Sequence, residues 1–123
     1  MLKWCAAAGQ LGTAFVQCKR SSANASYRKA LFSQAITQIS SSLLGRPARG
    51  LLGTWHTQID APNRPALPEY PYTYDLTKQL ISVANQHNDP GYGAFWAGMN
   101  VGQIRELEAA DLINQLVLEI KTH

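Results

Sequence analysis

The chain has 123 residues, enough for one ordinary domain with a single hydrophobic core. Hydrophobic residues make up 46% of it and charged residues only 15%, less than typical soluble domains carry, which favours a subunit with much of its surface covered. Apolar runs stay shorter than the roughly 18 residues of a membrane-spanning helix, so we expect no transmembrane segment.

The charge is divided unevenly along the chain. The net charge is +3, but residues 1–50 carry seven Lys and Arg and no acid, whereas residues 51–123 carry four cations and all eight acids. A long acid-free stretch rich in Ala and Ser is typical of a transit peptide, because a cationic amphipathic helix is drawn toward a negative interior. Residues 1–50 are therefore predicted to be a basic mitochondrial presequence with amphipathic helices. A cytoplasmic location is the alternative.

Two helices are predicted in this basic segment. Residues 2–20 are rich in Ala and Leu, but two glycines make a helix there marginal. The second helix spans about 27–43, where apolar residues recur at every fourth position: Tyr27, Leu31, Ala35, Ile39 and Leu43. Ser22 or Asn24 can cap its start, and Gly45 suits its end.

Residues 51–74 are predicted to form an extended Pro/Tyr-rich strap. Residues 51–59 alternate weakly, like a strand, but have no evident partner strand. Four prolines then repeat every three residues, as in a polyproline II helix: Pro62, Pro65, Pro68 and Pro71. Such a segment is either a stiff spacer or a docking segment that loses little entropy on binding.

Residues 75–123 are predicted to be helical. Asp75 is a suitable N-cap for a helix over 75–87, a short helix is expected within 92–99, and a last helix over 102–121 is apolar on more than one face. The sequence thus predicts a mainly α fold: a small helical protein with an extended proline-periodic strap between N-terminal and C-terminal helices.

Residues suited to catalysis or metal binding are not recognisable by local spacing. The three histidines have no acid or cysteine at metal-ligand spacing, and the glycines after residue 90 lack the spacing of a phosphate-binding loop. The sequence therefore predicts a protein that is not an enzyme, with no cofactor, no metal and no catalytic residue.

The first functional hypothesis is a non-catalytic accessory or structural subunit of a mitochondrial assembly, such as a respiratory complex, the ATP synthase or the mitoribosome. Its partners would be the protein subunits of that larger complex. Aromatic side chains offer amphipathic contact area to such partners. The predicted partner-binding residues are Trp55, Pro62, Pro65, Pro68, Tyr70, Pro71, Tyr72, Tyr74, Phe95 and Trp96.

The alternative is a small basic helical protein that binds nucleic acid. Residues 104–116 resemble the closing helix of small helical modules in phage-encoded recombination and regulatory proteins, which implies a phage or mobile-element origin. Cations gathered on one folded surface would contact phosphates, whereas import needs them only on a flexible segment. The residues predicted for either role are Lys19, Arg20, Arg28, Lys29, Arg46 and Arg49.

Overall fold

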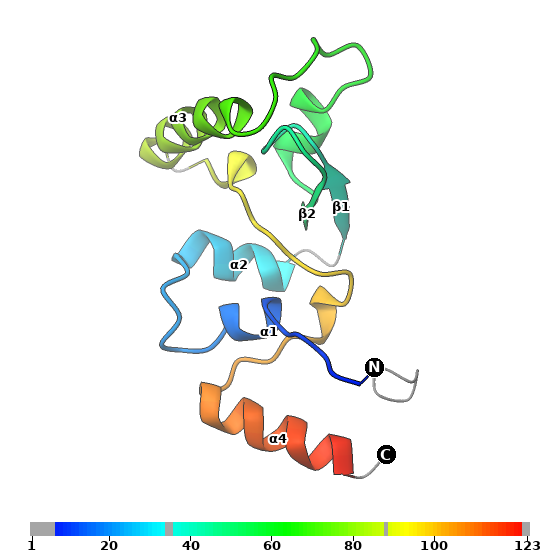
Figure 1. The fold of residues 1–123 in the computed structure, drawn as a ribbon. Helices are drawn as coiled ribbons and strands as arrows, with labels where there is room; N and C mark the ends of the chain where they lie inside the picture. The colour runs from blue at the N-terminus through cyan, green and yellow to red at the C-terminus, as the bar shows by residue number, and fades with distance from the viewer. Residues whose placement is uncertain (1–6, 34–35, 88, 122–123) are drawn as a thin grey trace.

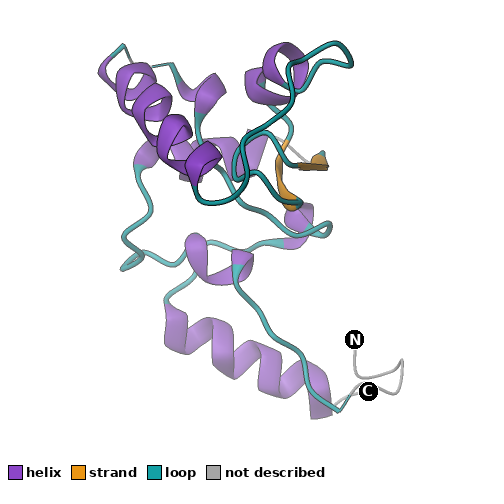
Figure 2. Cartoon of the chain, turned by 45° about the horizontal axis from the view of Figure 1, so that its top comes forward, coloured by secondary structure: helices purple, strands orange, loops and turns teal. Residues whose placement is uncertain are grey.

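The computed structural model describes residues 7–33, 36–87 and 89–121. Its elements form three tiers (Figure 1). The upper tier holds the longest helix and a two-stranded sheet, the middle tier two helices, and the lower tier the last helix. These are α3 (Tyr72–Gln86), β1 (Thr37–Ser40) and β2 (Ala48–Leu51); α1 (Thr13–Val16) and α2 (Ala25–Ser33); and α4 (Ala109–Lys121). Long loops join them (Figure 2).

The second helix starts where the sequence predicts but ends early. The Tyr27 N–H donates to Asn24 Oδ1 at 2.8 Å, so Asn24 caps α2, and of the two predicted caps it is Asn24 rather than Ser22 that does so. The helix ends at Ser33, and Thr37–Ser40 form a strand instead of the predicted continuation to residue 43. β-Branched residues suit a strand once a partner strand supplies the backbone hydrogen bonds. The every-fourth spacing of apolar residues does not reveal that partner, because it lies in another segment of the chain.

The partner strand is β2, which pairs with β1 in antiparallel register from Thr37 opposite Leu51 to Ser40 opposite Ala48. The Arg49 guanidinium crosses the pair and donates to the Thr37 carbonyl oxygen at 3.2 Å and to its hydroxyl at 3.1 Å. The extended structure predicted for residues 51–59 is therefore wrong beyond Leu51, because the strand lies earlier, over Ala48–Leu51, and Trp55–Ile59 form a π-helical turn.

The segment around Phe95 lies along the outer side of β2. The Leu51 N–H donates to the Phe95 carbonyl at 2.8 Å, and Gly50 forms a β-bridge with Trp96. A Cβ on Gly50 would lie 3.0 Å from the Phe95 carbonyl oxygen, so glycine permits this close approach. The short helix predicted within 92–99 is therefore wrong: residues 90–92 form a 3-10 turn and an extended segment follows.

The predicted strap contains helical structure near its start and at its end. Trp55–Ile59 form a π-helical turn, η2, and α3 already begins at Tyr72. Residues 61–71 contain no helix or strand, but the Arg64 N–H donates to the Ala61 carbonyl at 3.1 Å and closes a turn there. A continuous extended strap over 51–74 is therefore wrong.

The two C-terminal helices are confirmed, with shifted starts. α3 starts at Tyr72 and carries Asp75 in its first turn rather than as its cap. A carboxylate there still favours the positive end of the helix dipole. α4 starts at Ala109 rather than near residue 102, because Val101–Gln103 form a separate 3-10 turn.

The core lies where α2, β2 and the segment after Phe95 meet. Tyr27 of α2 stacks on Phe95 with ring centroids 5.0 Å apart, and its hydroxyl donates to the Trp96 carbonyl. The buried cluster is small: Leu31, Leu51, Ala97 and Val101. None of the described helices is both long and apolar enough to cross a membrane.

Candidate functional site

Two cations lie against two tyrosine rings where α3 begins. The Arg46 Cζ is 4.0 Å from the centroid of the Tyr70 ring, and the Lys78 Nζ is 4.2 Å from that of Tyr74. Both distances are within the range of cation–π attraction. We call Arg46, Tyr70, Tyr74 and Lys78 the tyrosine–cation cluster.

A turn between the two strands positions the first pair. Gly45 has φ of +79°, and a Cβ there would lie 2.8 Å from the Pro68 carbonyl oxygen and 3.0 Å from the Tyr70 nitrogen. Only a glycine allows the two backbones to approach this closely. Because Arg46 follows Gly45 directly, the same contact places its guanidinium over Tyr70.

Two buried threonines lie on one side of α3, and the first of them joins the helix to the loop before it. Thr73 and Thr77 are each only 4% exposed. The Thr73 hydroxyl donates to the Pro68 carbonyl, and the Thr77 hydroxyl donates to the Thr73 carbonyl at 2.8 Å. Tyr74 and Lys78 each directly follow one of these threonines. Because they are four residues apart, they share a side of α3, and this side lies next to the buried side.

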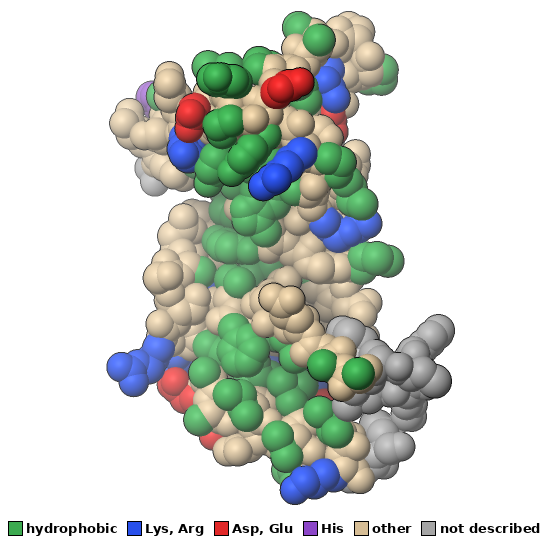
Figure 3. All heavy atoms as spheres, in the orientation of Figure 1, with side chains coloured by type: hydrophobic (Ala, Val, Ile, Leu, Met, Phe, Trp, Pro, Cys, Tyr) green, Lys and Arg blue, Asp and Glu red, His purple; other side chains and the backbone are tan. Residues whose placement is uncertain are grey.

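The cluster offers many hydrogen-bond donors beside apolar surface. Arg46 and Lys78 are exposed, and the Lys78 Nζ also lies 3.2 Å from Asp75 Oδ1. Guanidinium and ammonium groups donate in several directions, and the phenols add O–H donors. Hydrophobic side chains gather around α3, with Lys and Arg side chains beside them (Figure 3). This arrangement suits a small organic anion with an apolar body.

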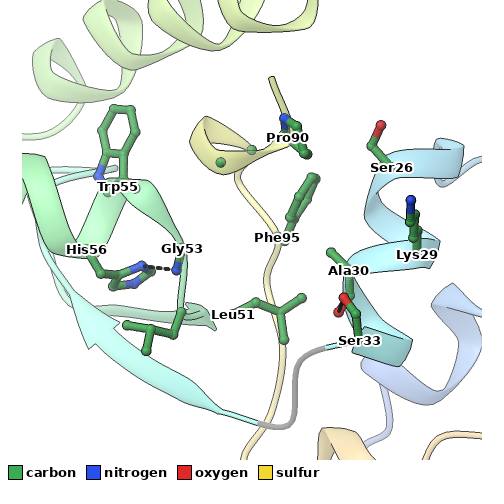
Figure 4. Close-up of a pocket in the computed structure, with 13 residues that line it drawn as sticks. Ser26, Lys29, Ala30, Ser33, Leu51, Gly53, Trp55, His56, Pro90 and Phe95 are labelled. Carbon is green, nitrogen blue, oxygen red and sulfur yellow. Dashed lines mark hydrogen bonds between the residues drawn. The ribbon is translucent and has the colours of Figure 1, made fainter. Parts of the chain in front are cut away.

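A cavity of about 370 Å³ lies between α2, the end of β2 and the Pro90–Phe95 segment (Figure 4). Leu51, Pro90 and Phe95 supply apolar surface. Its hydroxyl and ammonium groups come from the α2 wall: Ser26, Lys29 and Ser33. The cavity is large enough for a small ligand.

The imidazole of His56, which also lines this cavity, is turned toward the backbone. Its Nδ1 accepts from the Gly53 N–H at 3.3 Å, while His56 Nε2 and Trp55 Nε1 are buried without a hydrogen-bond partner in the described part of the chain. Burial lowers the pKa of His56, although Asp60 opposes this shift. The tyrosine–cation cluster carries two exposed cations, so it is the better candidate for an anion.

The predicted partner-binding residues do not form one surface. Trp55 is buried, and it meets Tyr92 edge to face at 6.3 Å. Phe95, Trp96 and Tyr74 are half-buried. The exposed members all belong to the loop before α3 and to its start: Pro62, Pro65, Pro68, Tyr70, Pro71 and Tyr72. Their binding to a partner stays a prediction.

Several of the predicted import or nucleic-acid cations make contacts within the chain. Arg49 joins the two strands, and the Lys19 Nζ lies 3.6 Å from Glu108 Oε1. Arg20 and Lys29 are exposed. Arg28 donates to four backbone carbonyls, those of Gln17, Lys19, Ser21 and Ala23. With Arg46, which lies over the Tyr70 ring, four of these six cations have a contact within the chain that phosphate binding would have to replace.

Sequence reasoning missed Lys78 as a site residue and assigned Arg46 to a different role. The signal that could have found Lys78 is its spacing of four from Tyr74, which places both side chains on one side of a helix. The contact of Arg46 with Tyr70 has no local signal, because the two residues come from different elements.

Comparison with known proteins assigns a family to this chain. The family model described as nitronate monooxygenase matches residues 1–119. A nitronate monooxygenase of Pseudomonas aeruginosa is 44% identical over 118 residues, which cover 94% of this chain and 34% of that protein. A nitronate monooxygenase of Paraburkholderia phytofirmans is 39% identical over 118 residues, which cover 94% of this chain and 32% of that protein.

A solved structure agrees with this assignment. The crystal structure of nitroalkane oxidase from Streptomyces ansochromogenes superposes with a TM-score of 0.83 at 34% identity, covering 94% of this chain and 33% of that one. The chain belongs to the nitronate monooxygenase family. It spans about a third of the length of the curated relatives that it matches.

The family overturns the predicted fold class and the prediction of a protein that is not an enzyme. The family fold is TIM-barrel-like, an α/β architecture, rather than a small helical fold with a strap. The family consists of oxidoreductases, so the hypothesis of a non-catalytic accessory subunit is wrong. Sequence patterns within this chain show its helices clearly, but a barrel is defined by pairing among many strands.

The mitochondrial location and presequence are also wrong. The family match includes residues 1–50, and relatives occur in bacteria, including one in Bacillus subtilis that is described as a probable nitronate monooxygenase. The basic segment therefore belongs to the family fold rather than to an import signal. The nucleic-acid-binding alternative has no support from these relatives.

Proposed function

We propose that this chain forms part of an enzyme that oxidises a nitronate, and that the tyrosine–cation cluster binds the nitronate anion. The family assignment supports the reaction class. The observation that carries the binding site is the placement of two cations, Arg46 and Lys78, on two tyrosine rings at the exposed start of α3.

The chemistry of the cluster fits this substrate. A nitronate is the anion that remains when a nitroalkane loses a proton from the carbon beside its nitro group, and its negative charge is spread over two oxygen atoms. An ammonium and a guanidinium group can donate charge-assisted hydrogen bonds to such oxygens. The Tyr70 and Tyr74 rings provide apolar surface for the alkyl part of the substrate.

Calorimetric titration of the chain with the anion of nitroethane tests the proposal. We expect Lys78→Met and Arg46→Met each to weaken binding by about tenfold or more, because each removes a charged donor. Lys121→Met is the matched control, since Lys121 lies at the end of α4, in the tier opposite α3 (Figure 1). Absence of binding, or equal binding by the Lys78 and Lys121 variants, would contradict the proposal.

A further inference from the structure

The cavity beside α2 has walls that contacts within the chain hold in place. The Phe95 ring stacks on Tyr27 of α2, with ring centroids 5.0 Å apart. A Cβ on Gly93 would overlap the Phe95 ring, and one on Gly53 would lie 3.2 Å from the Gly91 carbonyl oxygen. These glycines let the segments that form the walls approach closely, so the cavity is formed without a ligand.

The lining of the cavity is largely apolar and partly aromatic. Leu51 and Trp55 are 6% and 3% exposed, and both line the cavity together with Phe95. The volume of about 370 Å³ is in the range of small-molecule sites, which combine apolar walls with a few polar groups. Indole and phenyl rings pack edge to face or offset against another ring, so these walls suit an aromatic ligand.

The α2 wall adds a single charge to the cavity. Ser26, Lys29 and Ser33 are spaced by three and four residues and so share one side of α2, which lies across the cavity from Trp55 (Figure 4). Lys29 forms no ion pair with a described residue, and none of the described residues that line the cavity is acidic. An ammonium group that lacks a carboxylate partner and lies near hydroxyl donors favours an anionic acceptor.

We propose that this cavity binds a small aromatic monocarboxylate, with its carboxylate at Lys29 and its ring against Phe95 and Trp55. The carboxylate accepts from the ammonium group and from the serine hydroxyls, and the ring is removed from water. The site goes beyond the proposed function, since none of its residues belongs to the tyrosine–cation cluster.

Charge and enclosure distinguish the ligands of the two sites. The cluster presents two cations at the exposed start of α3, whereas the cavity presents one cation beside apolar walls. An anion without a ring, such as acetate, would leave those walls in contact with water and gain little from the cavity. The ring of the ligand is therefore as necessary as its charge.

The test is a titration of the chain with phenylacetate, followed through the indole N–H signals in a two-dimensional NMR spectrum. The chain has three tryptophans, and the signal that Trp55→Phe removes belongs to Trp55. We expect this signal to shift saturably, with a dissociation constant of about 1 mM. Phenylacetamide keeps the ring without the charge and acetate keeps the charge without the ring, so each should bind more weakly by about fivefold or more.

Lys29→Met should weaken the binding of phenylacetate by about fivefold or more, because it removes the charged donor and keeps an apolar stem. Lys121→Met is the matched control. Lys121 is exposed in the last turn of α4 and does not line the cavity, so the loss of its charge should leave the dissociation constant unchanged.

Ser26→Phe should abolish the binding of phenylacetate, because the larger side chain would fill the cavity from the α2 wall. Ala25→Phe is its matched control, since Ala25 is exposed on the same helix and does not line the cavity. Circular dichroism of each variant measures whether the helices remain folded.

Three results would overturn the proposal. The first is the absence of a saturable shift of the Trp55 signal. The second is equal affinity of the Lys29 and Lys121 variants for phenylacetate. The third is binding that Lys78→Met weakens and Lys29→Met does not, since the carboxylate would then lie at the tyrosine–cation cluster.

The two sites can fail separately. A chain whose Trp55 signal responds to phenylacetate through Lys29, but which does not bind the anion of nitroethane, would reject the proposed function and retain the cavity as a binding site. A chain that binds the anion of nitroethane through Lys78 and does not respond to phenylacetate would do the reverse.

Discussion

Gly45 approaches Pro68 so closely that a Cβ on the glycine would lie 2.8 Å from the proline carbonyl oxygen. This contact joins the turn between the strands to the residues before α3. The positive φ of Gly45, +79°, adds a second reason why a side chain is disfavoured there.

Replacement of this glycine should therefore destabilise the protein. We expect Gly45→Ala to lower the free energy of unfolding by about 1–3 kcal/mol, from backbone strain and the clash together. Urea denaturation measures the change. Gly102→Ala is the control, because a Cβ at Gly102 would meet nothing within 4 Å; equal stability of the two variants would refute the argument.

Asp60 should make stability depend on pH. The Ser42 hydroxyl donates to its Oδ1 at 2.7 Å and the Arg64 Nε lies 3.0 Å away. The Ser42 hydrogen bond is the main cause that lowers the pKa of Asp60, against an opposing effect of burial. The pKa of this carboxyl is lower in the folded state than in the unfolded chain, so its ionised form stabilises the fold at pH values above the unfolded-state pKa. This stability is lost as the pH falls through the folded-state pKa.

Denaturation midpoints measured from pH 6 to about pH 3 should therefore fall for the unsubstituted chain. Asp60→Asn removes the titrating group, so part of that fall should disappear in this variant. Asp75→Asn changes an exposed carboxylate and serves as the control. An acid dependence that is the same with and without Asp60 would show that this carboxylate is not the cause.

The contact of Lys78 with Tyr74 should be measurable as a coupling energy. A double-mutant cycle with Lys78→Met and Tyr74→Leu should give about 0.5–1 kcal/mol in stability, the range of an exposed cation–π pair. Urea denaturation of the four proteins supplies the values. Strictly additive effects would mean that the 4.2 Å contact contributes nothing.

Replacement of Arg28 by lysine should destabilise the protein, because the Arg28 guanidinium donates to carbonyls on both sides of the loop before α2. An ammonium group cannot reproduce this planar set of donors. We expect Arg28→Lys to cost about 1–3 kcal/mol in the free energy of unfolding. The exposed neighbour Lys29 provides the control: Lys29→Arg should change stability by less than about 0.5 kcal/mol. Equal effects of the two variants would contradict a structural role for Arg28.

The incorrect functional prediction has a specific physical origin. Acid-free composition over residues 1–50 is compatible with a transit peptide, but it is equally compatible with a folded segment whose cations donate hydrogen bonds to backbone carbonyls and between strands. Arg28 and Arg49 do the latter. Composition records that the cations are present, whereas their partners depend on the fold.

Local patterns were sufficient for α3, for α4 and for the cap of α2 by Asn24, because helix periodicity and capping act within a few residues. They were insufficient for β1, since a strand depends on a partner whose position in the sequence is not marked by periodicity. The continuation of the every-fourth pattern beyond Ser33 therefore predicted a helix where the chain pairs with β2.

The sequence by itself determined the C-terminal helices and the start of α2, but not the candidate site, because Lys78 was missed and Arg46 was assigned to a different role. Only the tertiary structure placed Arg46 over Tyr70, by the contact of Gly45 with Pro68. It also assigned Trp55 to the buried interior. The physical reason is that helix formation depends on neighbours along the chain, whereas the site and the core depend on approaches between segments that are distant in sequence.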